Sequence, residues 1–240
     1  MEKAEHLDHQ HQRGVMGAEY HDERLKSPGP RYRFKRRGIE VSRILQTFGV
    51  KNPKMLDIGT ADGLLLDLVC AETKPAIAIG LDLSWELLKT NSRKNPLIRA
   101  DAEKLPFPDS CFDAVIATAI IEHVPHPSQF VSEIRRVLNP SGICVITTPV
   151  PMFEEIASKL GFLKEDDHQE TFNLKTLTNL ISIHKFDILE SEKFMMSPVG
   201  FPAELSIERW IKKVGLSAIL LNQLVAGRKT HETTDEHRSD

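Results

Sequence analysis

Three aspartates carry the first chemistry that the sequence suggests. Asp57, Asp82 and Asp101 lie within or directly after three short apolar segments. An ionised carboxylate accepts strong hydrogen bonds from hydroxyl and amine donors, each contributing about 1.5–3 kcal/mol. Gathering three of them is costly unless a ligand supplies donors or positive charge. The three acids together therefore suit a ligand that carries an amine, a ribose and an adenine.

The turn after the first of these segments could receive such a ligand. Residues 57–63 read DIGTADG. Gly59 and Gly63 can adopt positive φ and allow close approach to the backbone, and Thr60 or Asp62 can cap the helix that follows. A tight strand-to-helix turn without a ligand has a similar pattern, so the turn alone does not decide the function.

Alternating apolar patterns predict the elements that position these groups. Strands are expected at residues 55–58, 76–81, 97–100, 112–118 and 143–148. Helices are expected between them, and another helix before them ends near Phe48. Uniformly apolar strands separated by helices predict an α/β fold with a doubly wound, mostly parallel sheet covered on both faces. Such sheets bind ligands at the carboxyl ends of their strands, where the acids would gather.

Four segments between Met55 and Pro149 resemble the class I S-adenosylmethionine-dependent methyltransferases, in the small-molecule branch that includes quinone-biosynthesis enzymes. They read DIGTADG, GLDLS, RADAEKLPFPDSCFDAVIATAIIEHVPHP and LNPSGICVITTP. The resemblance implies a Rossmann-like methyltransferase fold with an antiparallel last strand, S-adenosylmethionine as cofactor, and methyl transfer to a small molecule. An oxygen of an apolar or amphipathic metabolite is the first expected acceptor, and carbon is the next.

The resemblance also implies which residues contact the cofactor. Asp82 would bind the ribose, Asp101 would bind the adenine, and Thr118 would line the methyl-donor pocket. Ala61 departs from the family pattern, which usually has glycine there, so its methyl group must fit beside the cofactor. The full expected set is Asp57, Gly59, Thr60, Ala61, Gly63, Asp82, Leu83, Asp101, Ala102 and Thr118.

His123 is the candidate catalytic base, just beyond the fourth expected strand. An imidazole can remove a proton from a hydroxyl acceptor near neutral pH, whereas an already ionised acceptor needs no base. The alternative role is a structural hydrogen bond that braces the loop. Glu122 and His123 also resemble part of a metal-assisted site, but Ala119 replaces the further acid of that site, so no metal is predicted.

Two other functions remain open. A cofactor-binding scaffold without transfer activity would keep the same motifs. A nicotinamide-dependent oxidoreductase would also have a glycine turn and an acid after the second strand, but its G-x-G-x-x-G fingerprint does not match the spacing of Gly59 and Gly63. Asp57 would also repel a pyrophosphate.

The flanking segments predict the domain boundaries. Residues 1–30 are polar, end in SPGP and are expected to form a mobile arm. Residues 31–227 are expected to form the methyltransferase domain, with substrate or lid additions at 150–218. A last strand is expected within 220–226, with an extended helix as the alternative. Residues 228–240 contain no large apolar side chain and are expected to be a disordered tail.

An amphipathic helix is expected where Ile207, Trp210, Ile211 and Val214 recur at helical spacing opposite basic residues. Packing of this face as a lid is the first interpretation, and peripheral contact with a membrane is the alternative. The basic run from Arg31 to Arg37 is interpreted as a solvated charge cluster, with an anion site as the alternative.

Composition limits the remaining classes. The chain has 240 residues, 40% of them hydrophobic and 27% charged, as in an ordinary globular domain. The net charge of -3 argues against nucleic acid as a partner. The three cysteines lie singly in or beside apolar runs and predict a reduced, cytoplasmic protein, with membrane contact, if present, only peripheral. No pattern indicates an oligomeric state.

Overall fold

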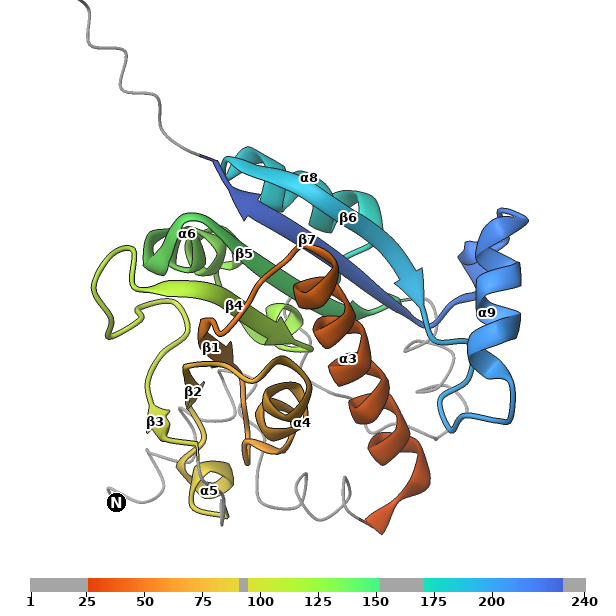
Figure 1. Cartoon of the computed structure of the whole chain (residues 1–240), viewed down its shortest axis with the longest axis horizontal. Helices are drawn as coiled ribbons and strands as arrows, with labels where there is room; N and C mark the ends of the chain where they lie inside the picture. The colour runs from red at the N-terminus through yellow and green to blue at the C-terminus, as the bar shows by residue number, and fades with distance from the viewer. Residues whose placement is uncertain (1–25, 91–94, 152–170, 231–240) are drawn as a thin grey trace, which may run out of the picture.

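The computed structural model describes residues 26–90, 95–151 and 171–230. A seven-stranded sheet has the order β3-β2-β1-β4-β5-β7-β6 (Figure 1). Its strands are β1 (Lys54–Ile58), β2 (Ile77–Asp82), β3 (Leu97–Arg99), β4 (Phe112–Thr118), β5 (Leu138–Pro149), β6 (Phe186–Phe194) and β7 (Asn222–Lys229). Strands β1 to β5 pair in parallel, and β7 is antiparallel to both β5 and β6. The predicted doubly wound, mostly parallel sheet with an antiparallel last strand is therefore confirmed.

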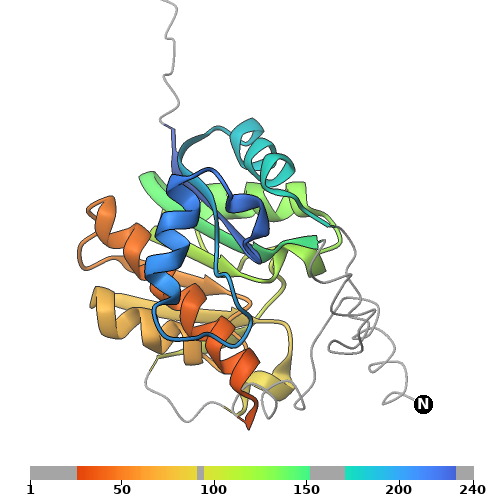
Figure 2. The same cartoon turned by 90° about the vertical axis from the view of Figure 1, so that its right-hand side faces the viewer.

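Helices cover both faces of this sheet. The helices of the described residues are α3 (Pro28–Thr47), α4 (Leu64–Thr73), α5 (Trp85–Leu88), α6 (Pro127–Val137), α8 (Leu174–Ile183) and α9 (Glu204–Lys213), with the 3-10 turns η1 (Ile121–His123) and η2 (Ser217–Ile219). Helices α3 and α4 pack on one face, and α6 and α8 pack on the other (Figures 1 and 2). Neighbouring residues of β4 enter opposite layers, because Val115 belongs to the α6 and α8 cluster and Ile116 to the α3 and α4 cluster.

Two predicted boundaries are wrong. The SPGP segment starts a helix instead of ending an arm, since Ser27 is the N-cap of α3 and Pro28 its first residue. Proline is favoured there because the first turn of a helix does not need its N–H group. At the other end, Arg228 still pairs with Ile143, so the last strand continues into the expected tail. The other residues of the predicted arm and tail, and residues 152–170 of the predicted lid, lie outside the described residues.

Helix α9 packs on α3 through charged side chains. Arg36 of α3 is only 2% exposed and donates to Glu40 at 2.7 Å and to Glu208 of α9 at 2.8 Å. Glu208 also accepts from the backbone N–H of Met195 at 3.0 Å, and Tyr32 donates to Glu204. The two acids of α9 therefore form its inner face.

This packing contradicts the expectation that the apolar face of α9 packs on the fold, while the lid role stays a prediction. Of the four residues expected to form the packed apolar face, only Ile211 is buried, while Ile207, Trp210 and Val214 are exposed. The amphipathic pattern alone could not show that a buried guanidinium on α3 would hold Glu208 inward. No helix in the described part of the chain combines the length and apolar character that crossing a membrane requires.

The pKa values of Arg36 and Glu40 are both shifted in the direction that favours the charged form. Burial lowers the pKa of the Arg36 guanidinium, but Glu40 and Glu208 outweigh it and the pKa is raised overall. Burial likewise raises the pKa of Glu40, and the hydrogen bond and charge of Arg43 together with the charge of Arg36 reverse this effect, so its pKa is lowered. Removing Glu208 would therefore leave the buried guanidinium of Arg36 paired with Glu40 but without its second acid.

We predict that Glu208→Ala lowers the free energy of unfolding by about 3–5 kcal/mol, because it leaves Arg36 buried with one acceptor fewer. Urea denaturation followed by circular dichroism would measure the change. Lys213→Ala, which removes an exposed charge from the same helix, serves as the control and should change stability by less than about 0.5 kcal/mol. Equal effects of the two substitutions would contradict a stabilising role for the ion pair.

Candidate active site

The glycine turn lies where the strand order of the sheet reverses. Strand β1 has β2 on one side and β4 on the other, and α/β sheets bind ligands at such a point. Gly59 and Gly63 have φ of 74° and 77°, the left-handed conformation expected of them. A Cβ on Gly59 would also lie 2.7 Å from Cδ1 of Ile120, so the turn requires glycine here. The backbone N–H groups of Gly59 and Thr60 donate to the carbonyl of Leu81, which joins the turn to β2.

The three aspartates lie at the same carboxyl edge. Asp57 is the penultimate residue of β1 and Asp82 the last residue of β2. Asp101 follows β3 by two residues, and the β2–β3 register pairs Asp82 with Arg99. Because these strands are parallel, their carboxyl ends meet along one edge, as the sequence pattern predicts. Their binding of a cofactor stays a prediction.

Asp57 is buried beneath the turn. Only 1% of the residue is exposed, and Thr60 Oγ1 donates to its Oδ2 at 2.7 Å. Thr60 therefore orients Asp57 and does not cap the helix. Asp62 accepts from the backbone N–H of Leu64 at 3.2 Å, so of the two expected capping residues it is Asp62 that serves the first turn of α4.

Asp82 connects the turn to the start of α5. Its Oδ2 accepts from the backbone N–H of Ala61 at 2.8 Å, and its Oδ1 accepts from that of Ser84 at 2.8 Å. A carboxylate can accept about four hydrogen bonds, so orientation by two backbone donors is compatible with binding a ribose diol. Ser84 also caps α5 as expected, because its hydroxyl accepts from the backbone N–H of Leu87.

The adenine-side residues follow β2 and β3. Asp101 Oδ1 accepts from the backbone N–H of Glu103 at 2.9 Å, which orients this carboxylate at the end of its strand. Ala102 is buried, and Leu83 is half-buried with its carbonyl bound by Arg99. Acid and apolar groups thus lie together in this part of the edge, as an adenine site requires.

The candidate base lies in η1, directly after β4. The backbone N–H of His123 donates to the carbonyl of Ile120 at 2.8 Å. Its neighbour Glu122 is 3% exposed and accepts from Thr148 Oγ1 at 3.0 Å, which ties η1 to the end of β5. Thr118 ends β4 in the same region and pairs with Thr147 of β5. Within residues 26–90, 95–151 and 171–230, no three His, Cys, Asp or Glu side chains gather as a metal site would need.

Sequence reasoning missed two residues of this region. Ile120 lies against Gly59, and Thr148 holds Glu122. Both lie inside the segments that carry the family resemblance, but neither was singled out as a site residue, and Thr148 is 26 residues from its partner. Besides these segments, the expected pairing of the fourth and fifth strands is a signal, because it brings the end of β5 beside η1.

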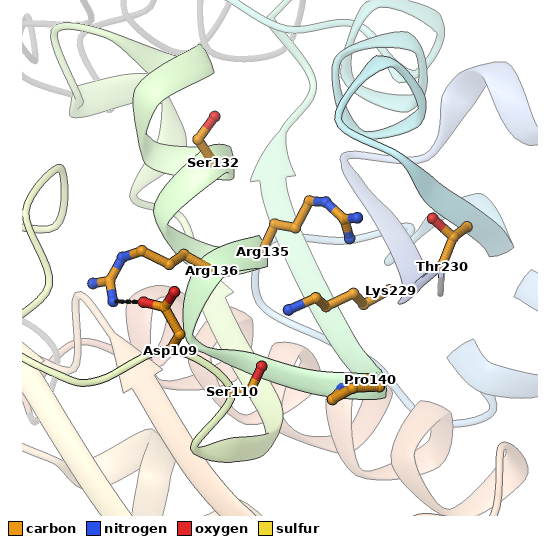
Figure 3. Close-up of a pocket in the computed structure, with 8 residues that line it drawn as sticks. All are labelled: Asp109, Ser110, Ser132, Arg135, Arg136, Pro140, Lys229 and Thr230. Atoms are coloured by element: carbon orange, nitrogen blue, oxygen red, sulfur yellow. Dashed lines mark hydrogen bonds and ion pairs between the residues drawn. The ribbon is translucent and has the colours of Figure 1, made fainter. Parts of the chain in front are cut away.

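A cavity of about 490 Å³ lies at the opposite, amino edge of the sheet (Figure 3). It is lined by Asp109, Ser110, Ser132, Arg135, Arg136, Pro140, Lys229 and Thr230. Arg136 pairs with Glu133 and Asp109, and Lys229 donates to the carbonyl of Leu138 at 2.7 Å. These cations stabilise the junction of α6 and β5. The cavity is therefore separate from the aspartate edge.

Comparison with known proteins shows which family the residues around this edge resemble. Residues 56–146 match the methyltransferase domain family. The matched segment contains the glycine turn, the three aspartates and His123. These residues are similar to the methyltransferase domain family, in agreement with the resemblance seen in the sequence. The match supports the predicted family, enzyme class and cofactor for residues 56–146, while the roles of single residues stay predictions.

Two curated relatives are named for the molecules that they methylate. The malonyl-[acyl-carrier protein] O-methyltransferase of Marinomonas sp. is 29% identical over 69% of this chain and 64% of the relative. The fatty-acid O-methyltransferase of Mycolicibacterium smegmatis is 29% identical over 44% of this chain and 40% of the relative. The chain thus spans less than two thirds of either relative. Neither name refers to quinone biosynthesis, and that branch stays a prediction.

A solved methyltransferase structure shows the same fold. An S-adenosylmethionine-dependent methyltransferase of Thermotoga maritima, described as a possible histamine N-methyltransferase, has a TM-score of 0.61 and 16% identity. The match covers 88% of this chain and 95% of that chain. At this identity the likeness supports the Rossmann-like architecture and not the acceptor.

The residues at the aspartate edge fit S-adenosylmethionine. The cofactor offers an ammonium group, a ribose diol and an adenine amine, all hydrogen-bond donors. The edge offers oriented carboxylates at Asp57, Asp82 and Asp101 beside a turn whose glycines expose the backbone. Donor and acceptor chemistry therefore match, and the buried negative charge gains compensation from the cationic ligand.

Ala61 is the departure from the family pattern that affects the turn itself. Its φ is 51°, in the left-handed region, and the residue is buried. In this conformation the alanine side chain destabilises the folded state by about 1–2 kcal/mol. Glycine avoids that strain, but it lowers the free energy of unfolding by about 0.4–1 kcal/mol because the unfolded chain gains conformational freedom. The strain is the larger of the two.

We predict that Ala61→Gly raises the free energy of unfolding by up to about 1 kcal/mol, because it removes this strain. Urea denaturation would measure it. Ala71→Gly is a matched control in α4, an ordinary helical position, and should lower stability by about 0.5–1 kcal/mol. If both substitutions destabilise the protein equally, the strain at Ala61 is refuted.

Proposed function

We propose that the chain transfers the methyl group of S-adenosylmethionine to an oxygen of an apolar or amphipathic small molecule, and that this oxygen belongs to the carboxylate of an acyl chain. The observation that carries the transfer is the placement of Asp57, Asp82 and Asp101 along the sheet edge that holds the glycine turn, within the family-matched residues. The names of the two curated relatives support an acyl carboxylate as acceptor.

The chain's own residues would bind and orient the reactants. The cofactor, when bound, supplies an electrophilic methyl group on a positively charged sulfur. Asp82 would accept the ribose hydroxyls, Asp101 the adenine amine, and Asp57 would lie on the methionine side. Thr118 would line the methyl-donor pocket. Orientation of two reactants can supply up to roughly 7–11 kcal/mol of a barrier, so positioning is the main task of these groups.

A carboxylate acceptor does not require His123 to act as a base. Carboxyl groups titrate near pH 4, so an acyl carboxylate is already ionised at neutral pH and needs no base. In this proposal His123 positions the loop or the acceptor. With a hydroxyl acceptor it would have to remove a proton.

The proposed partner is a small molecule, with no nucleic acid, in a reduced cytoplasmic compartment. The net charge of -3 and three unpaired cysteines support this setting. Burial raises the pKa of the Cys144 thiol to about 12, as expected of an unreactive structural cysteine.

We predict that Asp82→Ala weakens S-adenosylmethionine binding roughly 10- to 150-fold, the equivalent of one or two lost charge-assisted hydrogen bonds. Isothermal titration calorimetry would measure the dissociation constant. Asp187→Ala, which removes an exposed carboxylate from β6, is the control and should bind like the unaltered chain. Unchanged binding by Asp82→Ala would refute the proposed ribose contact.

We predict turnover with acyl carboxylates when the chain is given S-adenosylmethionine labelled in its methyl group. The acceptor panel contains fatty acids of several lengths, a carboxyl-terminated acyl thioester, phenols and quinols, and mass spectrometry detects the methylated product. Methyl ester formation supports the proposal. Products from phenols or quinols alone contradict the carboxylate acceptor, and cofactor binding without any product favours a scaffold. Binding of a nicotinamide cofactor instead would overturn the family-based function.

We predict that His123→Gln lowers kcat with an acyl carboxylate by less than about tenfold, because general-base catalysis contributes nothing to an ionised acceptor. Initial rates between acidic and alkaline pH would measure the effect, with the same profile expected for both proteins. A fall of about 10²–10⁴, accompanied by a changed pH profile, would assign the base role to His123 and contradict the carboxylate acceptor.

A further inference from the structure

Exposed apolar side chains are concentrated in the connection between β6 and β7. Eight of the eleven large apolar side chains that are exposed in the described part of the chain lie between Val199 and Ile219. They are Val199, Phe201, Leu205, Ile207, Trp210, Val214, Leu216 and Ile219. Scattered exposed apolar residues are ordinary, but a concentration of this kind marks an interaction surface.

The outer side of α9 combines apolar and cationic groups. Ile207, Trp210 and Val214 recur at i, i+3 and i+7 and therefore share one side of the helix. Arg209 and Lys213 are also exposed. Helix α9 lies at the margin of the molecule in Figure 1, and the exposure of Ile207, Trp210 and Val214 shows that this side of the helix faces solvent.

The acids of this connection do not face outward. Residues 195–221, all described, contain two acids, and both Glu204 and Glu208 are buried against α3. The ion pair with Arg36 thus removes negative charge from the outer surface and leaves the positive charges there. A surface of this composition complements a negatively charged, partly apolar partner.

Helix α3 adds positive charge beside the same connection. Tyr32 donates to Glu204, and a Cβ on Gly29 would lie 3.5 Å from Val199, so the first turns of α3 contact the 198–204 segment. Arg31 and Lys35 are exposed on these turns, and the one acid of α3, Glu40, is buried.

We propose that this face, formed by residues 199–219 and the first two turns of α3, binds the surface of an anionic lipid membrane. Tryptophan and apolar side chains would enter the interfacial layer, and Arg31, Lys35, Arg209 and Lys213 would contact the anionic headgroups. An anionic membrane offers an apolar layer for the apolar side chains and negative charge for the basic ones. A second copy of the chain could cover the apolar side chains, but it would place positive charges against positive charges.

The structure changes the membrane contact expected from the sequence. Ile211, one of the four expected residues, is buried and takes no part, while residues before and after α9 join the surface. The connection joins the carboxyl end of β6 to the start of β7, so it lies at the same edge of the sheet as the aspartates. An amphipathic acceptor could therefore reach this edge from the membrane.

Fluorescence of Trp210 tests the proposal on the full chain. Trp85→Phe leaves Trp210 as the remaining tryptophan, because the chain has two. Vesicles of phosphatidylcholine mixed with phosphatidylglycerol should shift its emission to shorter wavelength and sediment with the protein, and high salt should weaken the binding. Vesicles of phosphatidylcholine alone should bind less. Absence of binding, or equal binding to both vesicle types, would overturn the proposal.

Variants separate the apolar and charged contributions. In the same background, the double substitution Ile207→Asn and Val214→Asn should weaken vesicle binding at least roughly tenfold. Lys213→Gln should weaken it roughly fivefold. The controls are Ile183→Asn and Lys104→Gln, which alter exposed residues on other elements and should bind like the parent. Equal losses in the controls would contradict a defined binding face.

The membrane surface is independent of the proposed function. The double variant should keep the cofactor affinity of the parent and its turnover of a short, water-soluble acceptor. Absence of methyl transfer would leave the vesicle result standing, and absence of vesicle binding would leave the transfer reaction standing. A dimer in analytical ultracentrifugation that the double substitution dissociates would identify a second copy as the occupant and overturn the membrane proposal.

Discussion

The carboxylate of Asp82 holds together the parts on which the candidate site depends. It accepts from the backbone N–H of Ala61 in the glycine turn and from that of Ser84 at the start of α5. The turn after β1 and the helix after β2 are therefore fixed to one side chain. Because parallel strands end at a common edge, this arrangement also sets the positions of Asp57 and Asp101. A ligand that binds the same carboxylate would be placed against both elements.

A second constraint, the buried pair of Arg36 and Glu208, decides what the other end of this edge presents to solvent. Burying an ion pair is costly unless further hydrogen bonds satisfy both charged groups. Here Glu40 accepts from Arg36, and the backbone N–H of Met195 donates to Glu208. The consequence is that α9 turns its acids inward and its apolar side chains outward. A stabilising interaction inside the fold thus produces a basic and apolar surface outside it.

The fold is shared with a solved methyltransferase structure, but the fold does not determine the acceptor. The aspartate edge lies within the residues that match the methyltransferase domain family, and we propose that the acceptor binds beside η1 and the end of β5. In this chain those segments include the buried pair of Glu122 and Thr148 beside His123. One fold supports many functions, so the acceptor has to be argued from these local groups and not from the fold.

The sequence by itself determined the sheet, the glycine turn and the three aspartates, because apolar periodicity, positive φ at glycine and strand ends are local properties. The matches at Phe112–Thr118 and at the Ser84 cap illustrate this. It also assigned Pro28 to an arm instead of the first turn of α3, since a proline at N1 has the same local signature as a loop. Only the tertiary structure decided the orientation of α9. Arg36 and Glu208 are 172 residues apart, and helical periodicity cannot show which face a distant buried charge will hold inward.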